Sequence, residues 1–139
     1  MTSVVEYINP PGACPAQGLY SHLGKVSDGS LLFVAGKISV AADGSVAGVN
    51  DFAAQFDQIF KNLGAVLNGV GCDFNDVVKF TTYMVNADDL DQFMQLRAAL
   101  FPTLFKDSAY PPNTLLMINR LVKPEFLIEV EAIVKGRSA

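Results

Sequence analysis

The stretch "FLIEVEAIV", Phe126 to Val134, decides the fold because its two faces have opposite characters. In an extended strand, successive side chains point to opposite faces of the sheet. One face is wholly apolar and consists of Phe126, Ile128, Val130, Ala132 and Val134. The other face places two carboxylates, Glu129 and Glu131, between aliphatic residues. This asymmetry predicts a sheet that packs helices against one of its faces.

The two carboxylates of this strand admit two interpretations. At two-residue strand spacing, Glu129 and Glu131 lie roughly 7 Å apart. They form either a solvent-facing strip or a site with a partly buried carboxylate. Partial burial raises the pKa of a carboxyl group, and such a group can shuttle protons.

Apolar periodicity predicts the remaining elements. Apolar residues fall in steps of three and four over residues 52–70, which predicts a helix that Asn50 or Asp51 caps. Alternating or continuous apolar runs predict the strands. We expect strands over residues 31–40, 77–85, 114–121 and 126–134, a hairpin turn at Asp43-Gly44, and irregular structure over residues 1–24.

A second helix is expected to begin near Asp88 or Asp89, and Pro102 should kink or end it. Its inward residues are predicted to be Leu90, Phe93, Leu96 and Leu100. Arg97 lies four residues after Phe93 and therefore borders this buried stripe. Either Arg97 extends its guanidinium to water, or it projects into a subunit interface, where it would bind a carboxylate.

The order of elements indicates the class of fold. Two helices accompany four or five strands, which predicts a single α+β domain over residues 1–139 with a mixed or mostly antiparallel sheet. The helices should cover one face of this sheet. Half of the residues are hydrophobic, so the chain is either an unusually apolar monomer or buries apolar surface against copies of itself. We favour the second, because a small domain has little interior, and we expect these copies to cover the other face.

Composition argues against several classes of function. The net charge is −4 and no basic cluster is present, so nucleic-acid binding is not expected. No apolar run approaches the length of a membrane span, and the first thirty residues do not read as a signal peptide. With one histidine and two distant cysteines, no metal site is expected. We expect a cytoplasmic protein with free thiols.

Three further polar residues are candidates for a site. Tyr20 either donates a hydrogen bond to a substrate or simply packs. His22 has no nucleophile at a recognisable spacing, which favours a structural or surface role. Arg120 is out of phase with Asn113 along the same predicted strand and is expected at an edge or on the surface.

Five motifs in order give the chain a family resemblance. "GLYSHLGKV", "LLFVAGKI", "GCDFNDVVKFTTYMVNADDLDQF", "PPNTLLMINRL" and "IEVEAI" resemble the Rid/YjgF family, also described as L-PSP endoribonuclease-like proteins. The resemblance spans the chain from about Tyr20 to Ile133. It implies a chorismate-mutase-like, YjgF-like fold that assembles as a barrel-centred homotrimer with one pocket at each subunit interface. It also implies hydrolysis of reactive imines and enamines without a metal or an organic cofactor.

The resemblance also implies roles for individual residues. Glu129, the first glutamate of "IEVE", would transfer protons through a water molecule, and Tyr20 would be the tyrosine of the pocket. Phe93 would wall the pocket. Ala35 and Gly36 would line the site from the strand over residues 31–40.

The chain departs from the family motif Pro-x-Arg, because Asn113 stands where that arginine is expected. An asparagine brings neither the charge nor the two-pronged donor geometry that binds a substrate carboxylate. Leu115, on the same face, makes the site more apolar. The resemblance places Arg97 at a helix position that is often asparagine in the family and lies near the pocket. We therefore consider that the arginine and the asparagine have exchanged places.

Three functions follow from these observations. The first is a hydrolytic deaminase that acts on the C=N bond of a non-standard imine, enamine or related small metabolite. The second is a binding protein with the same pocket and no turnover. The third is an endoribonuclease, against which the acidic composition argues.

Overall fold

The computed structural model describes residues 5–137. In chain order, the elements are β1 (Glu6–Ile8), β2 (Leu23–Lys25), β3 (Leu31–Lys37), α1 (Phe52–Gly69), β4 (Val77–Met84), α2 (Leu90–Leu104), β5 (Asn113–Met117) and β6 (Ile128–Lys135). Short 3-10 turns at Phe74–Asp76 and Ala87–Asp89 lead into β4 and α2 respectively.

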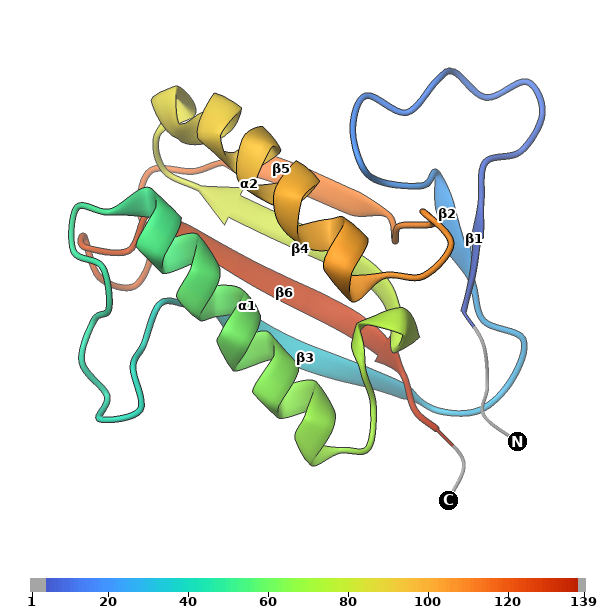
Figure 1. Cartoon of the computed structure of the whole chain (residues 1–139), viewed down its shortest axis with the longest axis horizontal. Coiled ribbons are helices and arrows are strands. Elements are labelled where there is room, and N and C mark those ends of the chain that lie inside the picture. The colour runs from blue at the N-terminus through green and yellow to red at the C-terminus, as the bar shows by residue number, and fades with distance from the viewer. Residues whose placement is uncertain (1–4, 138–139) are drawn as a thin grey trace.

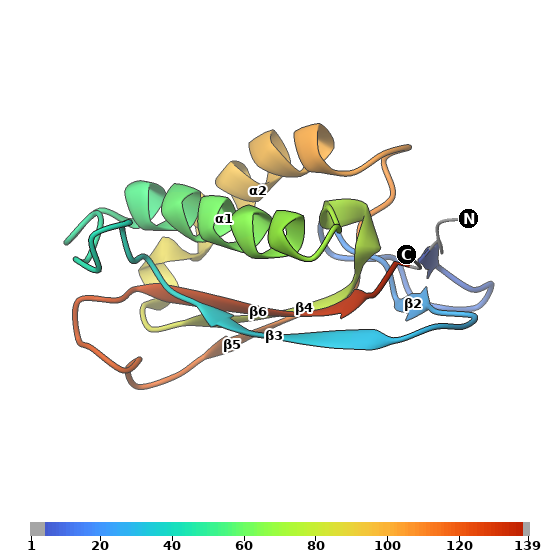
Figure 2. The same cartoon turned by 90° about the horizontal axis from the view of Figure 1, so that it is seen from below.

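Four strands form one mixed sheet in the order β3-β6-β4-β5. β6 pairs antiparallel with both β3 and β4, whereas β5 runs parallel to β4. Both helices lie on one face of this sheet, and the opposite face is open (Figures 1 and 2). β1 and β2 form a separate two-stranded ribbon beside the β5 side of the sheet. The predicted α+β class, with a mixed sheet and helices on one face, is confirmed.

Aromatic side chains fill the layer between the helices and the sheet. Phe60 of α1 has its ring centroid 5.7 Å from that of Phe101 and 6.1 Å from that of Phe80, both edge to face. The apolar face of β6, predicted from the sequence, joins this core. Complete burial of one such side chain stabilises the fold by roughly 1.5–3 kcal/mol.

The ends of the helices follow local rules. Asp51 caps α1, because its side chain accepts a hydrogen bond of 3.0 Å from the Ala54 N–H. α2 runs two residues beyond Pro102, so of the two expected outcomes, a kink or an end, the end was wrong. Phe101 and Phe105 are both buried in the core on either side of Pro102, and this packing outweighs the one backbone hydrogen bond that proline removes.

The strand predictions differ from the structure in several places. The segment expected to be irregular contains β1 and most of β2, whose three-residue strands are too short to give a periodic signal. The strand expected over residues 114–121 ends at Met117, because its neighbour β4 ends at the paired residue Met84. The Asp43-Gly44 turn forms, but only a single bridge, Val40 to Val46, follows it.

Candidate functional site

A pocket of about 220 Å³ lies where α2 covers β5. It is lined by Gln17, Tyr20, Met94, Arg97, Asn113 and Leu115. Four of these, Tyr20, Arg97, Asn113 and Leu115, are residues that the sequence placed in a site. The fold therefore brings together residues that are distant in the sequence and come from the segment before β2, from α2 and from β5.

Arg97 is the buried charge of this pocket. It is only 3% exposed, so the interpretation in which it extends to water was wrong. Arg97 lies on the same side of α2 as Phe93 and Phe101, four residues away in each direction, and this side faces the core. Burial lowers the pKa of Arg97, because the charged form loses solvation.

The contacts of Arg97 hold it without neutralising it. Its guanidinium carbon lies 5.0 Å from the centre of the Phe93 ring, and its Nη2 lies 3.1 Å from Met94 Sδ. A β-carbon added to Gly18 would lie 2.5 Å from the same nitrogen, so the guanidinium packs against a bare α-carbon. Among residues 5–137, none of the ion pairs involves Arg97. A buried charge in this state favours an anionic ligand.

Phe93 does not wall the pocket as the resemblance implied. It is 1% exposed and lies beneath Arg97, with its ring edge to face against Phe56 at 5.8 Å. The reason is its position on the core side of α2, which turns the ring toward α1. Phe93 thus supports the guanidinium from below.

Two hydrogen bonds orient the other polar groups of the pocket. Thr82 Oγ1 donates to Asn113 Oδ1 at 2.7 Å. The Gln17 backbone N–H donates to the Tyr20 hydroxyl oxygen at 3.0 Å. Thr82 and Gln17 were missed in the sequence, although Thr82 shares the strand alternation of buried Phe80 and Met84, which is a usable signal.

Glu129 lies on the open face of the sheet. Its neighbours in β6, Ile128 and Val130, point into the core, so strand alternation turns Glu129 the other way. Its carboxylate packs against the α-carbon of Gly36 in β3, and a β-carbon added there would displace it. Ala35, beside Gly36, is exposed. The site assigned by resemblance is therefore divided in one chain, with Tyr20 and Arg97 on the helix face and Glu129, Ala35 and Gly36 away from them.

The environment of Glu129 supports the second of its two interpretations. Glu129 is half-buried, and its pKa is raised, first by burial and then by the nearby charge of Glu131, with Lys37 opposing the shift. Glu131 accepts a hydrogen bond of 2.7 Å from the Tyr83 hydroxyl, which raises the pKa of Tyr83.

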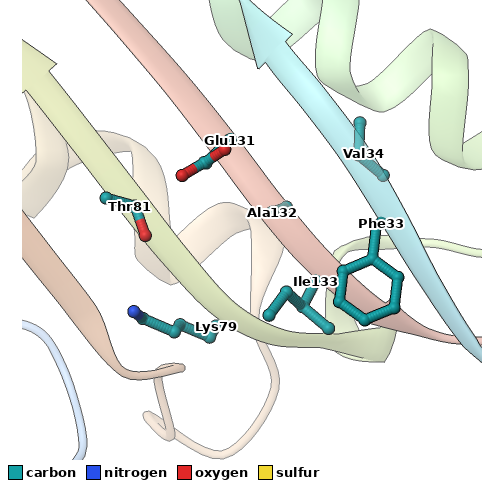
Figure 3. Close-up of a pocket in the computed structure, with 7 residues that line it drawn as sticks. All are labelled: Phe33, Val34, Lys79, Thr81, Glu131, Ala132 and Ile133. Carbon is teal, nitrogen blue, oxygen red and sulfur yellow. The ribbon is translucent and has the colours of Figure 1, made fainter.

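Glu131 also lines a depression of about 240 Å³ on the open face, together with Phe33, Val34, Lys79, Thr81, Ala132 and Ile133. Figure 3 shows Glu131 and Thr81 directed into the space between neighbouring strands, with Phe33 beside Ile133. Phe33 is 75% exposed, so this face carries apolar surface that neither helix covers.

The structure also shows where Arg120 and His22 lie. Arg120 is exposed and donates to the backbone carbonyls of Leu121 and Val122, so its predicted surface position is confirmed. The His22 ring contacts the Cys14 carbonyl oxygen at 2.5 Å, which favours the structural role expected for it. Within residues 5–137, no cluster of metal-ligating side chains occurs and no helix is long and apolar enough to cross a membrane.

Fold and pocket together define a small α+β protein with a pocket at one sheet edge that contains a buried arginine. The family model described as Endoribonuclease L-PSP matches residues 12–135, and the chain belongs to this family, which is the Rid/YjgF family. A relative from Rattus norvegicus, named 2-iminobutanoate/2-iminopropanoate deaminase, is 28% identical over 96% of this chain and 92% of its own length. The family therefore includes imine deaminases.

Solved structures agree on the fold. A Rid-family protein of unknown function from Yersinia pestis has a TM-score of 0.84 and 30% identity, covering 94% of this chain and 98% of its own. TdcF from Escherichia coli, solved with bound serine, has a TM-score of 0.68 and 24% identity, covering 95% and 97%. At that identity, the second likeness concerns the fold alone.

Proposed function

We propose that the protein is a hydrolytic deaminase that acts on the C=N bond of a reactive imine, an enamine or a related small metabolite that carries a carboxylate. The observation that carries the proposal is the state of Glu129, a half-buried carboxylate with a raised pKa. A general base or acid works best when its pKa lies near the working pH, and a raised pKa moves a glutamate in that direction. No metal or organic cofactor takes part in the proposed reaction.

The proposed reaction moves both protons of one water molecule to the imine nitrogen. Glu129 removes the first proton as the water oxygen attacks the imine carbon, and returns it to the nitrogen to give a carbinolamine. Glu129 then takes the remaining hydroxyl proton and delivers it to the nitrogen, so the C–N bond breaks with ammonia leaving as the C=O bond forms. One imine and one water thereby give one carbonyl compound and one ammonia. An enamine is first protonated at carbon to give the imine.

The proposal places the site between two copies of the chain, because Glu129 and the Arg97 pocket lie on opposite faces of one sheet. β3 and β5 are the two edges of this sheet, so each has an unpaired side. Glu129 lies against Gly36 of β3, and the pocket lies at β5. If the β5 edge of one copy adjoins the β3 edge of the next, one copy supplies the pocket and the other supplies Glu129. Repeated contacts of this kind close into a ring, which we propose is a trimer.

Mixing two inactive variants tests the shared site. We expect Glu129→Gln and Arg97→Met to be inactive alone and to regain activity when co-expressed in hybrid assemblies. In a hybrid trimer of either composition, one site in three combines an intact pocket with an intact glutamate. The measurement is the specific activity of hybrids purified through a different tag on each variant. Assembled variants mixed without subunit exchange serve as the control, and hybrids as inactive as this control would contradict a shared site.

The proposed hydrolysis is tested by ammonia release. Imines generated in situ by amino-acid oxidases form a panel that varies in side-chain size and in the presence of the carboxylate. We expect the native chain to release ammonia from some carboxylate-bearing members faster than spontaneous hydrolysis does. Release at the spontaneous rate across the whole panel would reject the deaminase.

The exchange of arginine and asparagine gives a second prediction with this panel. Asn113→Arg/Arg97→Asn restores the arrangement that the family motif implies, so we expect it to gain hydrolysis of small 2-imino acids. Asn113→Arg alone puts two guanidinium groups in one pocket, and their repulsion should make it less active than the double variant. Equal activity of the double variant and the native chain on every panel member would show that the two residues do not set the substrate.

A non-catalytic binding protein is the second candidate, and Asn113 is the observation that favours it. An amide in place of a guanidinium weakens the hold on a substrate carboxylate, and a glutamate can also remain in a site that only binds. Such a protein would bind one small molecule per pocket in a calorimetric titration and release no ammonia from any imine.

A further inference from the structure

Asn113 has a fixed orientation, and a neighbouring residue sets it. Its side-chain oxygen accepts the Thr82 hydroxyl proton at 2.7 Å. An asparagine amide has its donor and its acceptor on opposite branches, so occupying the oxygen leaves the nitrogen as the group that faces away from Thr82. Among the hydrogen bonds of residues 5–137, none uses Asn113 Nδ2, although Asn113 lines the pocket.

Tyr20 and Arg97, which line the same pocket, can also donate hydrogen bonds to a ligand. The Tyr20 oxygen accepts from the Gln17 N–H, so its own proton is available to donate. Arg97 has only donors, and its Nη2 contact with Met94 Sδ is with a weak acceptor. Gln17 differs, since it is exposed and its side-chain nitrogen donates to the Pro15 carbonyl.

We propose that Thr82 is a positioning residue that turns the Asn113 amide so that Asn113, Arg97 and Tyr20 all present donors, which makes the pocket select a carboxylate over the matching carboxamide. The inference rests on the proposed function for the identity of this pocket as the substrate's carboxylate site. A carboxylate accepts hydrogen bonds and offers none, so it satisfies three converging donors. A carboxamide brings an NH2 group that finds no acceptor among them. The apolar part of the ligand would lie against Leu115 and Met94.

This arrangement gives Asn113 a positive role in the pocket. A freely rotating amide could offer its oxygen to the ligand and would then repel a carboxylate. In that orientation the amide nitrogen would face Thr82 and donate to its oxygen, and the hydroxyl proton would lose its acceptor. Thr82 is 2% exposed, so solvent does not replace that acceptor, and the reversed orientation is the costlier one. Selection for a carboxylate is thus achieved without the guanidinium that the family motif places at position 113.

The test measures binding and needs no turnover. The probes are 2-oxobutanoate and 2-oxobutanamide, titrated calorimetrically into the full-length protein in its native assembly. The readout is the ratio of the two dissociation constants. We expect Thr82→Val, which removes the hydroxyl and keeps the shape, to weaken binding of the carboxylate about tenfold and to leave binding of the carboxamide less affected.

Two more variants make the result decisive. Thr82→Ser restores a hydroxyl and should recover the native ratio, whereas Asn113→Asp replaces the donor by an acceptor and should lose the carboxylate preference. Thr103→Val removes an exposed hydroxyl outside the pocket and controls for the substitution itself. If Thr82→Val leaves the ratio of the two dissociation constants unchanged, the proposal is overturned. It is also overturned if Thr82→Ser loses the carboxylate preference as fully as Thr82→Val does. If Thr82→Val does not fold, the ratio of Asn113→Asp decides. A carboxylate preference in the native chain that Thr82→Val loses, without ammonia release from any imine, would uphold this inference and reject the deaminase.

Discussion

Glu129→Gln is expected to lower kcat by roughly 10²–10⁴-fold, the contribution typical of a positioned general acid or base. Glutamine keeps the size and one hydrogen-bonding oxygen of glutamate but cannot carry the proton between water and nitrogen. The measurement is ammonia release at saturating imine. A variant with kcat within a few-fold of the native value would remove Glu129 from the chemistry.

The raised pKa of Glu129 also predicts how Glu129→Gln affects the stability of the fold. The folded state holds the Glu129 proton more tightly than the unfolded chain, whose glutamates titrate near the ordinary value of 4.5. The free energy of unfolding therefore falls as pH rises from about that value through the raised pKa of the folded protein. At pH 7, we expect Glu129→Gln to be at least as stable as the native chain in thermal unfolding. A lower Tm would mean that Glu129 stabilises the fold.

Glu131→Gln is the matched control on the same strand. It should retain turnover because Glu131 lies two residues further along and is bonded to Tyr83. Removing its charge lowers the pKa of Glu129, so the acid limb of the kcat/KM profile should move to lower pH. An acid limb that stays in place would exclude Glu129 as the titrating group.

Arg97→Met is expected to reduce kcat/KM for carboxylate-bearing imines by about 30-fold to several thousand-fold, which corresponds to roughly 2–5 kcal/mol for a lost charge-assisted contact. Methionine has a similar length and fills the space without the charge. Imines without a carboxylate should lose far less. A uniform loss over both kinds of substrate would contradict binding of the carboxylate by Arg97.

Stability separates this role of Arg97 from a structural one. A buried guanidinium without an acidic partner is costly, and its replacement by an apolar side chain of similar volume is often neutral or stabilising. We therefore expect Arg97→Met to keep or raise the Tm while activity falls. A fall in Tm by many degrees would instead assign Arg97 to the support of α2.

The local rules of the sequence predicted the helix-covered sheet well. The two faces of residues 126–134 predicted both the buried and the open side of β6, and the periodicity of residues 52–70 predicted α1 to within one residue at its end. These patterns depend on neighbours along the chain, which a sequence displays. The class of fold follows from them because the helices bury their apolar stripes against the apolar face of the sheet.

The arrangement of the site could be predicted only in part. The sequence paired Arg97 with Asn113, and the structure places both at one pocket. It did not reveal that Glu129 lies on the opposite face, because this depends on how β5 registers on β4 and β4 on β6, which are non-local pairings. The burial of Arg97 likewise depends on the segment before β2, whose Gly18 packs against the guanidinium and which carries no periodic signal.

Two glycines, Gly36 and Gly18, make room for the charged groups of Glu129 and Arg97. The Glu129 carboxylate rests on Gly36, and the Arg97 guanidinium rests on Gly18. Neither glycine has a positive φ, so the backbone itself would accept another residue at both positions. Substitution at these positions is limited by the space that the charged groups occupy. Even alanine would displace the Glu129 carboxylate at position 36 and the Arg97 guanidinium at position 18. In a deep mutational scan scored for activity, substitutions of the two glycines should be about as damaging as substitutions of Glu129 and Arg97.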